Sequence, residues 1–495
     1  METTFRHNAD DNLSSRGFYR LSRLRADRSR AGGYSKGRLM QDRNPLVVRL
    51  LILAIVLGIS CSLLAQTPLT LTHAVSIALE KNPLRKAALA DERVSTASVS
   101  EARSGLWPRI TFSETATRGN DPVYAFGTRL RQGRFSAADF ALNRLNSPTP
   151  IGDFTTRFGG QWRLFDSFSN VLNVRRAQNM KEAASRQLQR TDQETIFRVV
   201  NAYYGLLLAQ KQQQLAEQAA QTSQAILHDS RNRFQSGLVV ESDYLSAQVN
   251  HASRQQQLIQ ARNDVALARV QLNVALGVSP DQPFQPGEAL DEKPLAAAPL
   301  DELEKRALES RPDLKRVMAE EAAQATGVSL AKAAFGPRIN AFGSWQLDNP
   351  TMFAGGGANN WVAGAELQFD LFSGGEKMAH LKRERALKEK AAALRQAFAD
   401  GVKLELRKAY FDHDAARQML DVTRASVSQA EESLRINQNR YNGGLTTITD
   451  LLRVEEATRK ARTDYWQSVY QYQITYANLE LAAGTLNAQS PVVTQ

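Results

Sequence analysis

Alternating apolar and polar positions mark short segments in both halves of the chain. From Ile339 to Leu347, apolar or small side chains occupy every second position, and 361–369 shows the same alternation. In the first half, 154–164 repeats the pattern, and a partner strand is expected after Pro108. Alternation over about ten residues is typical of tilted strands that cross a membrane. We predict two such strands in each half; the alternative is an amphipathic hairpin on a soluble domain.

Most of the remaining chain shows helical spacing. The segments 169–235 and 376–442 are equal in length and free of proline, and each could form a helix of roughly 100 Å. Steps of three and four residues between apolar positions, as from Val265 to Ala275, are typical of coiled-coil packing. The helices are rich in Gln, Ala and Arg, which favours the walls of a hollow helical tube over a thick hydrophobic core.

A similar turn follows each long helical segment. The sequence RFQSGL at 233–238 recurs as RYNGGL at 440–445. Gly237 and Gly444 stand where a helix commonly ends in a left-handed residue. The expected N-cap regions of the returning helices are Ser242-Asp243 and Thr449-Asp450. Each copy is therefore predicted to form a long helical hairpin with its tip at the glycine.

The whole design occurs twice in the chain. Matching prolines such as Pro83 and Pro312 lie 229 positions apart, whereas from Leu164 and Leu371 onward the separation is 207. The difference of 22 residues indicates an insertion in the first copy, between Ile110 and Leu164. The predicted division is a leader with signal peptide (1–65), a first repeat (66–279), a proline-rich linker (280–299), a second repeat (300–487) and a short tail (488–495).

The first 65 residues are expected to be a secretory leader. Leu46 to Ala65 is an apolar run behind basic residues, and a start at Met40 would give a signal of ordinary length. The leader carries +6 of the formal net charge of +11, so the charge is weak evidence for a nucleic-acid partner. Cys61, the only cysteine, lies in this signal and is a candidate for lipid attachment, although Gly58 stands where a leucine-like residue is preferred.

Residues for catalysis or metal binding are not grouped in this sequence. The six histidines form no pair at metal-ligand spacing, and no Ser-His-Asp or paired-carboxylate arrangement can be argued. His413 lies between Asp412 and Asp414, which we interpret as a solvated helix face. The glycine run 355–357 lacks a following Lys-Ser/Thr and falls in a predicted loop. We therefore predict no enzymatic activity, no metal and no cofactor.

Four strands are too few to close a barrel, and lipid does not tolerate an open sheet edge, so if these strands span a membrane, several chains must contribute to one barrel. In order and spacing the repeats resemble the TolC family of outer-membrane efflux proteins, over about 66–487. The motifs that carry the resemblance are Asn82-Pro83 and Arg311-Pro312, Pro108 and Pro337 between helix and strand, LFSGG at 371–375, and both Arg-aromatic turns.

The resemblance implies a mainly α fold with a membrane β-barrel contribution. Three chains would form a twelve-stranded barrel in outer-membrane lipid and a twelve-helix periplasmic tube. The tube would meet a periplasmic adaptor (membrane fusion) protein joined to an inner-membrane pump or ABC exporter. The chain would then be the passive exit duct of a tripartite efflux or type I secretion system. The alternative is a periplasmic coiled-coil scaffold without channel activity, which has no need of two matched amphipathic hairpins.

The hairpin tips are the predicted adaptor-docking sites, because they are the points farthest from the membrane. The residues concerned are Arg233, Gly237, Leu238, Arg440, Gly444 and Leu445. The alternative is that the glycines only allow the chain to turn and that the tips dock no partner.

The resemblance also implies a periplasmic gate near the tips, in altered form. Tyr441 and Asp243 match a tyrosine–aspartate pair that closes the family's tube, and Asp450 matches the first aspartate of the ring at its constriction. Thr446 stands where the family archetype has a latch arginine, and Arg453 where it has the second ring aspartate. We therefore expect a Tyr441–Asp243 hydrogen bond, a less tightly closed pore and weak cation selectivity.

The segments 119–153 and 348–360 are the expected extracellular loops, since the strands leave the periplasmic helices at Pro108. Phe126, Phe135 and Phe140 suggest that the longer loop packs on itself.

Overall fold

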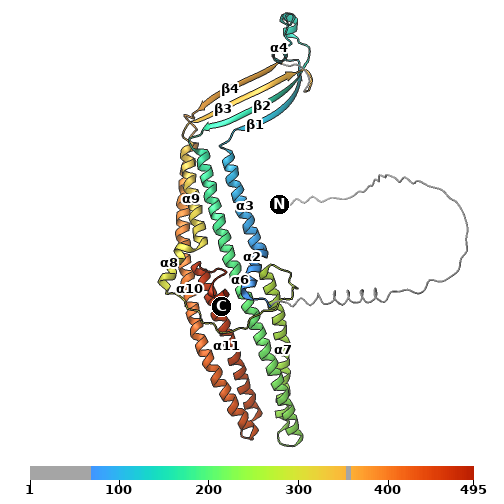
Figure 1. Cartoon of the computed structure of the whole chain (residues 1–495), viewed down its shortest axis with the longest axis vertical. Helices are drawn as coiled ribbons and strands as arrows, with labels where there is room; N and C mark the ends of the chain where they lie inside the picture. The colour runs from blue at the N-terminus through green and yellow to red at the C-terminus, as the bar shows by residue number, and fades with distance from the viewer. Residues whose placement is uncertain (1–67, 353–357, 495) are drawn as a thin grey trace, which may run out of the picture. The chain divides into compact units, whose positions relative to one another are not determined.

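The computed structural model describes residues 68–352 and 358–494, which Figure 1 shows as long helices below a small sheet. The predicted leader, the start at Met40, Cys61 and the glycine run 355–357 lie outside these residues. Residues 66–495 form one unit. Within the described ranges, no helix combines the length and the apolar character needed to cross a membrane.

Each repeat opens with two helices separated by an X-Pro step. They are α2 (Leu71–Lys81) and α3 (Pro83–Ser104) in the first repeat, and α8 (Leu300–Ser310) and α9 (Pro312–Ala333) in the second. Their lengths are 11 and 22 residues in both repeats. The proline takes the first helical position, where its missing N–H costs nothing. Asn82 and Arg311 before it have ψ values of 125° and 122°, so the chain bends between the helices.

The four predicted strands form one antiparallel sheet in chain order. They are β1 (Arg109–Gly119), β2 (Ile151–Phe165), β3 (Arg338–Asn349) and β4 (Asn359–Gln368). Phe112, Phe158, Trp345 and Trp361 are direct partners across the four strands and form an aromatic row on one face. Ring centroids are 5.2 Å apart between Phe112 and Phe158 and 6.0 Å apart between Phe158 and Trp345.

The insertion in the first repeat folds into short helices at the end of the sheet far from the long helices (Figure 1). It contains α4 (Pro122–Arg131), the 3-10 helix η1 (Ala137–Phe140) and α5 (Leu142–Asn146). Phe126, Phe135 and Phe140 pack edge to face, with ring centroids 4.7, 5.1 and 6.3 Å apart. The prediction that this segment packs on itself is confirmed.

The long helices have the predicted spans. α6 (Ser169–Gln235) and α10 (Glu376–Asn442) each contain 67 residues, and the returning helices α7 (Glu241–Leu276) and α11 (Ile448–Ala483) each contain 36. The duplicated unit deduced from the sequence therefore holds to the residue in its helices.

The hairpin tips confirm one expectation and correct another. Gly237 and Gly444 are left-handed, with φ of +71° and +73°. The N–H after each glycine donates to a carbonyl five residues earlier, at 2.8 Å in both tips. The returning helices begin earlier than expected, because the N-caps are Val240 and Thr447. Only Thr447 caps with its side chain, by accepting from the N–H of Asp450.

The largest apolar core lies midway along the helices, where α2, α6, α7 and α11 meet the linker and the C-terminal helix α12 (Pro491–Thr494). The proline-rich linker packs closely onto this core. Its Leu295 donates its N–H to the Tyr472 hydroxyl (3.0 Å) and accepts from that hydroxyl at its carbonyl (2.8 Å). A second, smaller core joins α8, α10 and α11. Away from these two cores the described parts of the helices carry fewer buried apolar residues, as the Gln- and Arg-rich sequence indicates.

Candidate functional site

Each hairpin tip presents a leucine to solvent. Leu238 is 74 % exposed and Leu445 is 72 % exposed, and both directly follow the left-handed glycine. The neighbouring arginines differ between the tips. Arg440 is exposed, whereas Arg233 bonds Asp229 at 2.8 Å and lies over the Tyr441 ring, with its guanidinium carbon 4.9 Å from the ring centroid. Arg233 is therefore less available for docking than the sequence indicates.

Tyr441 connects the two repeats near the tips, although not through its expected partner. It is buried in a small cluster with Ile448 and Leu451. Within the described residues, no hydrogen bond joins its hydroxyl to Asp243, so that prediction is not met. Burial raises the pKa of Tyr441, and the nearby Arg233 opposes the rise. Arg233 belongs to α6 and Tyr441 to α10, so their ring contact crosses from the first repeat to the second.

Asp450, in the first turn of α11, is held by three neighbours at the start of that helix. Thr447 and Thr446 donate their hydroxyls to it at 2.8 and 3.2 Å, and Arg453 lies 3.4 Å from its other carboxylate oxygen. The hydrogen bonds from Thr447 and Thr446 hold the pKa of Asp450 below its usual value. The Asp450 carboxylate thus has a cation of its own helix beside it, and its place in a ring of mixed charge stays a prediction.

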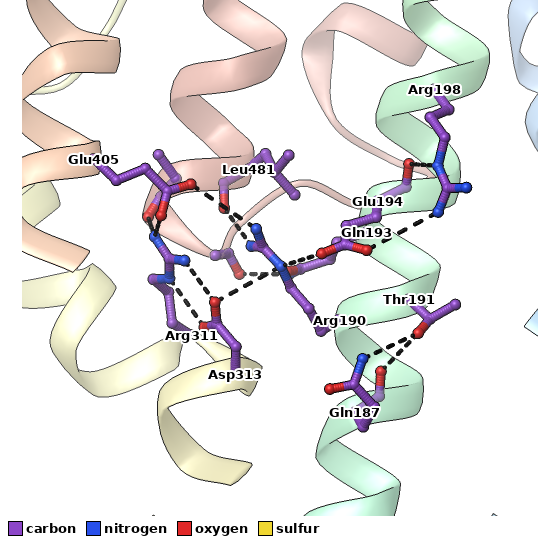
Figure 2. Close-up of polar contacts among 12 residues, drawn as sticks. Gln187, Arg190, Thr191, Gln193, Glu194, Arg198, Arg311, Asp313, Glu405 and Leu481 are labelled. Carbon is purple, nitrogen blue, oxygen red and sulfur yellow. Dashed lines mark hydrogen bonds and ion pairs between the residues drawn. The ribbon is translucent and has the colours of Figure 1, made fainter. Parts of the chain in front are cut away.

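A buried ionic cluster lies where the second repeat meets the first (Figure 2). Arg311, only 2 % exposed, donates two hydrogen bonds to Asp313, at 2.6 and 3.0 Å, and one to Glu405, at 2.8 Å. Arg190 of α6 adds a second cation 3.7 Å from Asp313 and donates to the carbonyl of Leu481 at 3.2 Å. The cluster therefore ties α6 of the first repeat to α9, α10 and α11 of the second.

The same position in the first repeat is occupied by a neutral residue with the same backbone contact. Asn82 donates its side-chain N–H to the carbonyl of Ala275 at 2.9 Å, and Arg311 donates to that of Ala482 at 3.1 Å. Both acceptors lie 207 positions apart, which is the repeat offset of the long helices. The sequence motifs Asn-Pro and Arg-Pro marked these positions, but not the cluster around the arginine.

His413 is buried, which corrects the expectation of a solvated face. Its ring stacks on Tyr472 with centroids 5.0 Å apart, and its Nδ1 lies 3.3 Å from the Thr475 hydroxyl. Burial lowers the pKa of His413. The spacing from Ala409 through His413 to Leu420 is that of a helix core stripe, and this signal outweighs the flanking aspartates.

Metal-binding groups are not found in the described residues: no set of three His, Cys, Asp or Glu side chains there could hold an ion.

Comparisons with known proteins agree with this architecture. The family model described as outer membrane efflux protein matches residues 74–278 and 303–485. The chain is 24 % identical to the alkaline protease secretion protein AprF of Pseudomonas aeruginosa, over 83 % of each chain. It is 26 % identical to the protein CyaE of Bordetella pertussis, over 84 % of each chain.

The solved structure of the Campylobacter jejuni CmeC outer membrane channel has the same fold. It superposes with a TM-score of 0.73 at 18 % identity, over 85 % of this chain and 87 % of that one. The family match extends over both repeats, so it covers the helices, the sheet and both tips. The chain therefore belongs to the outer membrane efflux protein family, whose trimers form an exit duct in the outer membrane and work with periplasmic adaptors and inner-membrane pumps.

Proposed function

We propose that this chain is a passive duct without catalytic activity of its own, and that its two hairpin tips dock the adaptor. The pair of exposed leucines at matching positions, Leu238 and Leu445, carries this proposal. Equal helix lengths in the two repeats bring both tips to the same end of the molecule (Figure 1). A trimer would offer each leucine three times.

Burial of these leucines supplies a physical reason for docking. Fully burying a leucine side chain is worth about 1.5–3 kcal/mol. The N–H of each leucine donates to the carbonyl of the tip arginine five residues earlier, which restrains the local backbone, so less conformational entropy is lost when a partner covers the side chain.

The test is a double change of Leu238 and Leu445 to aspartate. It should abolish export of the pump's substrate while trimers still form in the outer membrane, because six buried carboxylates would oppose docking. The matched control changes both leucines to methionine, which keeps an apolar side chain of similar volume and should preserve export. Normal export by the aspartate variant would exclude these residues from the adaptor interface.

We also propose that Arg233 helps to hold the periplasmic end closed. Its contact with Tyr441 joins α6 to α10, and Asp229 fixes the guanidinium in place. A cation–π contact of this kind contributes about 0.5–2 kcal/mol. Together with the unmet Tyr441–Asp243 bond, this supports a gate held by a weaker and different link than the resemblance implies.

Planar-bilayer recordings test the role of Arg233. Replacing Arg233 with methionine keeps an unbranched side chain but removes the guanidinium and its charge, so the variant should spend a several-fold larger fraction of time in its open state. Replacement with lysine, which can still lie over the ring, should have a smaller effect. An unchanged open fraction for Arg233→Met would refute this part of the proposal.

A further inference from the structure

The two faces of the sheet differ in chemistry. Thr115, Thr155 and Asp348 lie side by side in register on the face opposite to the aromatic row. The Thr155 hydroxyl lies 3.2 Å from Asp348, and Arg157 on the same face donates to Ser344 at 3.0 Å. In a closed membrane barrel the apolar face meets lipid and the polar face lines the lumen. The hydrogen-bonded face is therefore the lumen face.

The insertion helix α4 contacts this lumen face at its beginning. A β-carbon placed on Gly119 would lie 3.4 Å from the ring of Tyr124, in the first turn of α4. Gly119 has the same parity along β1 as Thr115, so its β-carbon position points to the lumen face. The Tyr124 hydroxyl also donates to the carbonyl of Thr117 at 3.1 Å, which fixes the ring over the end of β1.

Two further contacts follow at the other end of α4. Gln132 donates to the Asp153 carboxylate at 2.8 Å, and Asp153 is the register partner of Thr117 on the lumen face. A β-carbon placed on Gly133 would lie 3.5 Å from that of Ala358, which precedes β4. The segment from Tyr124 to Gly133 therefore runs from the end of β1 past β2 to the residue before β4. The ten residues of α4 span about 15 Å, which matches roughly 14 Å for three strand spacings.

The sides of α4 are clearly divided. Ala125, Thr128 and Gln132 are buried and share one side of the helix. Val123 and Leu130 are 80 % and 50 % exposed. At about 100° per residue they lie roughly 160–180° from Gln132, which bonds Asp153 of β2, and so on the side away from the barrel wall.

The rest of the insertion packs against α4 through Arg129 and Phe126. Asp139 accepts a bond from Arg129 of α4 at 2.7 Å and from Arg144 of α5 at 3.4 Å. Phe126 of α4 lies in the three-phenylalanine cluster. These contacts hold the helix as part of a folded unit.

We propose that α4 of the three protomers forms an apolar constriction inside the outer mouth of the duct, lined by Val123 and Leu130. This inference rests on the trimeric duct and adds a second narrow point, at the opposite end from the periplasmic gate. Such a ring impedes hydrated ions by dewetting and admits a wide passage only when cargo displaces the helices. It makes the mouth selective against small polar molecules entering from outside.

The experiment places a cysteine at Leu130 in the full chain, which has no cysteine after Cys61. Single trimers in a planar bilayer are exposed to a bulky cationic methanethiosulfonate reagent on the side of the insertion. Three protomers carry three thiols, so the current should fall in three discrete steps. The reagent should react more slowly when it is added on the periplasmic side, because it must first pass the proposed periplasmic gate to reach the lumen.

Two further variants keep the outcome decisive. Val123→Cys lies on the same side of α4 and should give the same three steps if Leu130→Cys fails to assemble. Trp361→Cys lies on the opposite, lipid-facing side of the sheet and should give none. Channels that conduct normally but show no steps at either α4 position would overturn the constriction and leave the duct intact. Failure of the unaltered chain to form channels would instead count against the trimeric duct and, with it, this inference.

Discussion

Replacing Arg311 with methionine tests how the two repeats are held together. Arg311 is buried and supplies two hydrogen bonds to Asp313, one to Glu405 and one to the carbonyl of Ala482. Methionine fills similar space, but among the described residues it leaves Asp313 with Arg190, at 3.7 Å, as its one nearby cation. Glu405 is about half exposed and can turn to water. The loss of stability therefore comes mainly from the Asp313 carboxylate, which stays buried without its main cation.

The magnitude follows from breaking a buried pair. Removing one partner of such a pair costs about 3–5 kcal/mol, because the remaining charge stays buried without compensation. Changing Asp313 to asparagine as well removes that charge, so Arg311→Met/Asp313→Asn should regain at least half of the loss. Urea denaturation of the detergent-solubilised trimer, followed by circular dichroism, measures the differences.

The pH dependence gives a second check. Burial by itself would raise the pKa of Asp313, but hydrogen bonds and charge from Arg311 outweigh it and the pKa is lowered. A lowered pKa stabilises the fold above the unfolded value near ~3.9, and this contribution is lost as the pH falls through the folded value. Without Arg311 the Asp313 carboxyl protonates more readily. The difference in free energy of unfolding between Arg311→Met and the unaltered protein should therefore become smaller from pH 7 to pH 4. Equal stability of the two at pH 7, or a double variant no better than the single one, would refute the reasoning.

Three other predictions follow from single positions. Gly484→Ala should destabilise the trimer more than Gly237→Ala, because both have φ above +70° but only at Gly484 would a β-carbon come within 2.9 Å of backbone atoms; thermal denaturation compares them. Burial raises the pKa of Glu480 to about 7, so its neutral form stabilises the fold below pH ~4.5 and this contribution is lost as the pH rises through 7. Glu480→Gln should remove that loss and gain about 1–3 kcal/mol at pH 8, measured by the same denaturation across pH. Arg453→Ala should leave the Asp450 carboxylate without its cation, so reversal potentials in a salt gradient should shift toward cation selectivity.

The helices and strands were predictable because their signals are local. Proline-free segments, left-handed glycines and period-two alternation each act within a few residues, and the duplication supplies every element twice. The start of α7 was placed too late because Val240 caps without a side chain and gives no signal. Thr447 does cap α11 with its side chain, so there the sequence offered more than one threonine and the expected cap, Thr449, was the later one.

The contacts of Arg233, Arg311 and His413 depend on which helices meet, so they could not be deduced locally. Arg233 looks like any exposed tip arginine until α10 brings Tyr441 beneath it. His413 has two acidic neighbours in sequence, yet its helical phase buries it. The gate and docking assignments remain predictions for the experiments above.

The aromatic row on the sheet affects how the barrel sits in lipid. A row of direct partners runs perpendicular to its strands, and barrel strands tilt by about 35–45° from the membrane normal. Over three strand spacings, about 14 Å, the row from Phe112 to Trp361 therefore climbs roughly 9 Å through the bilayer. Around a trimer there are three such aromatic rows, each inclined to the membrane plane, instead of one ring of aromatic side chains at a constant depth. Lipid in contact with such a wall meets a bulky ring at a depth that varies with its position around the circumference, so the annular shell should be unevenly ordered and should repeat every third of a turn.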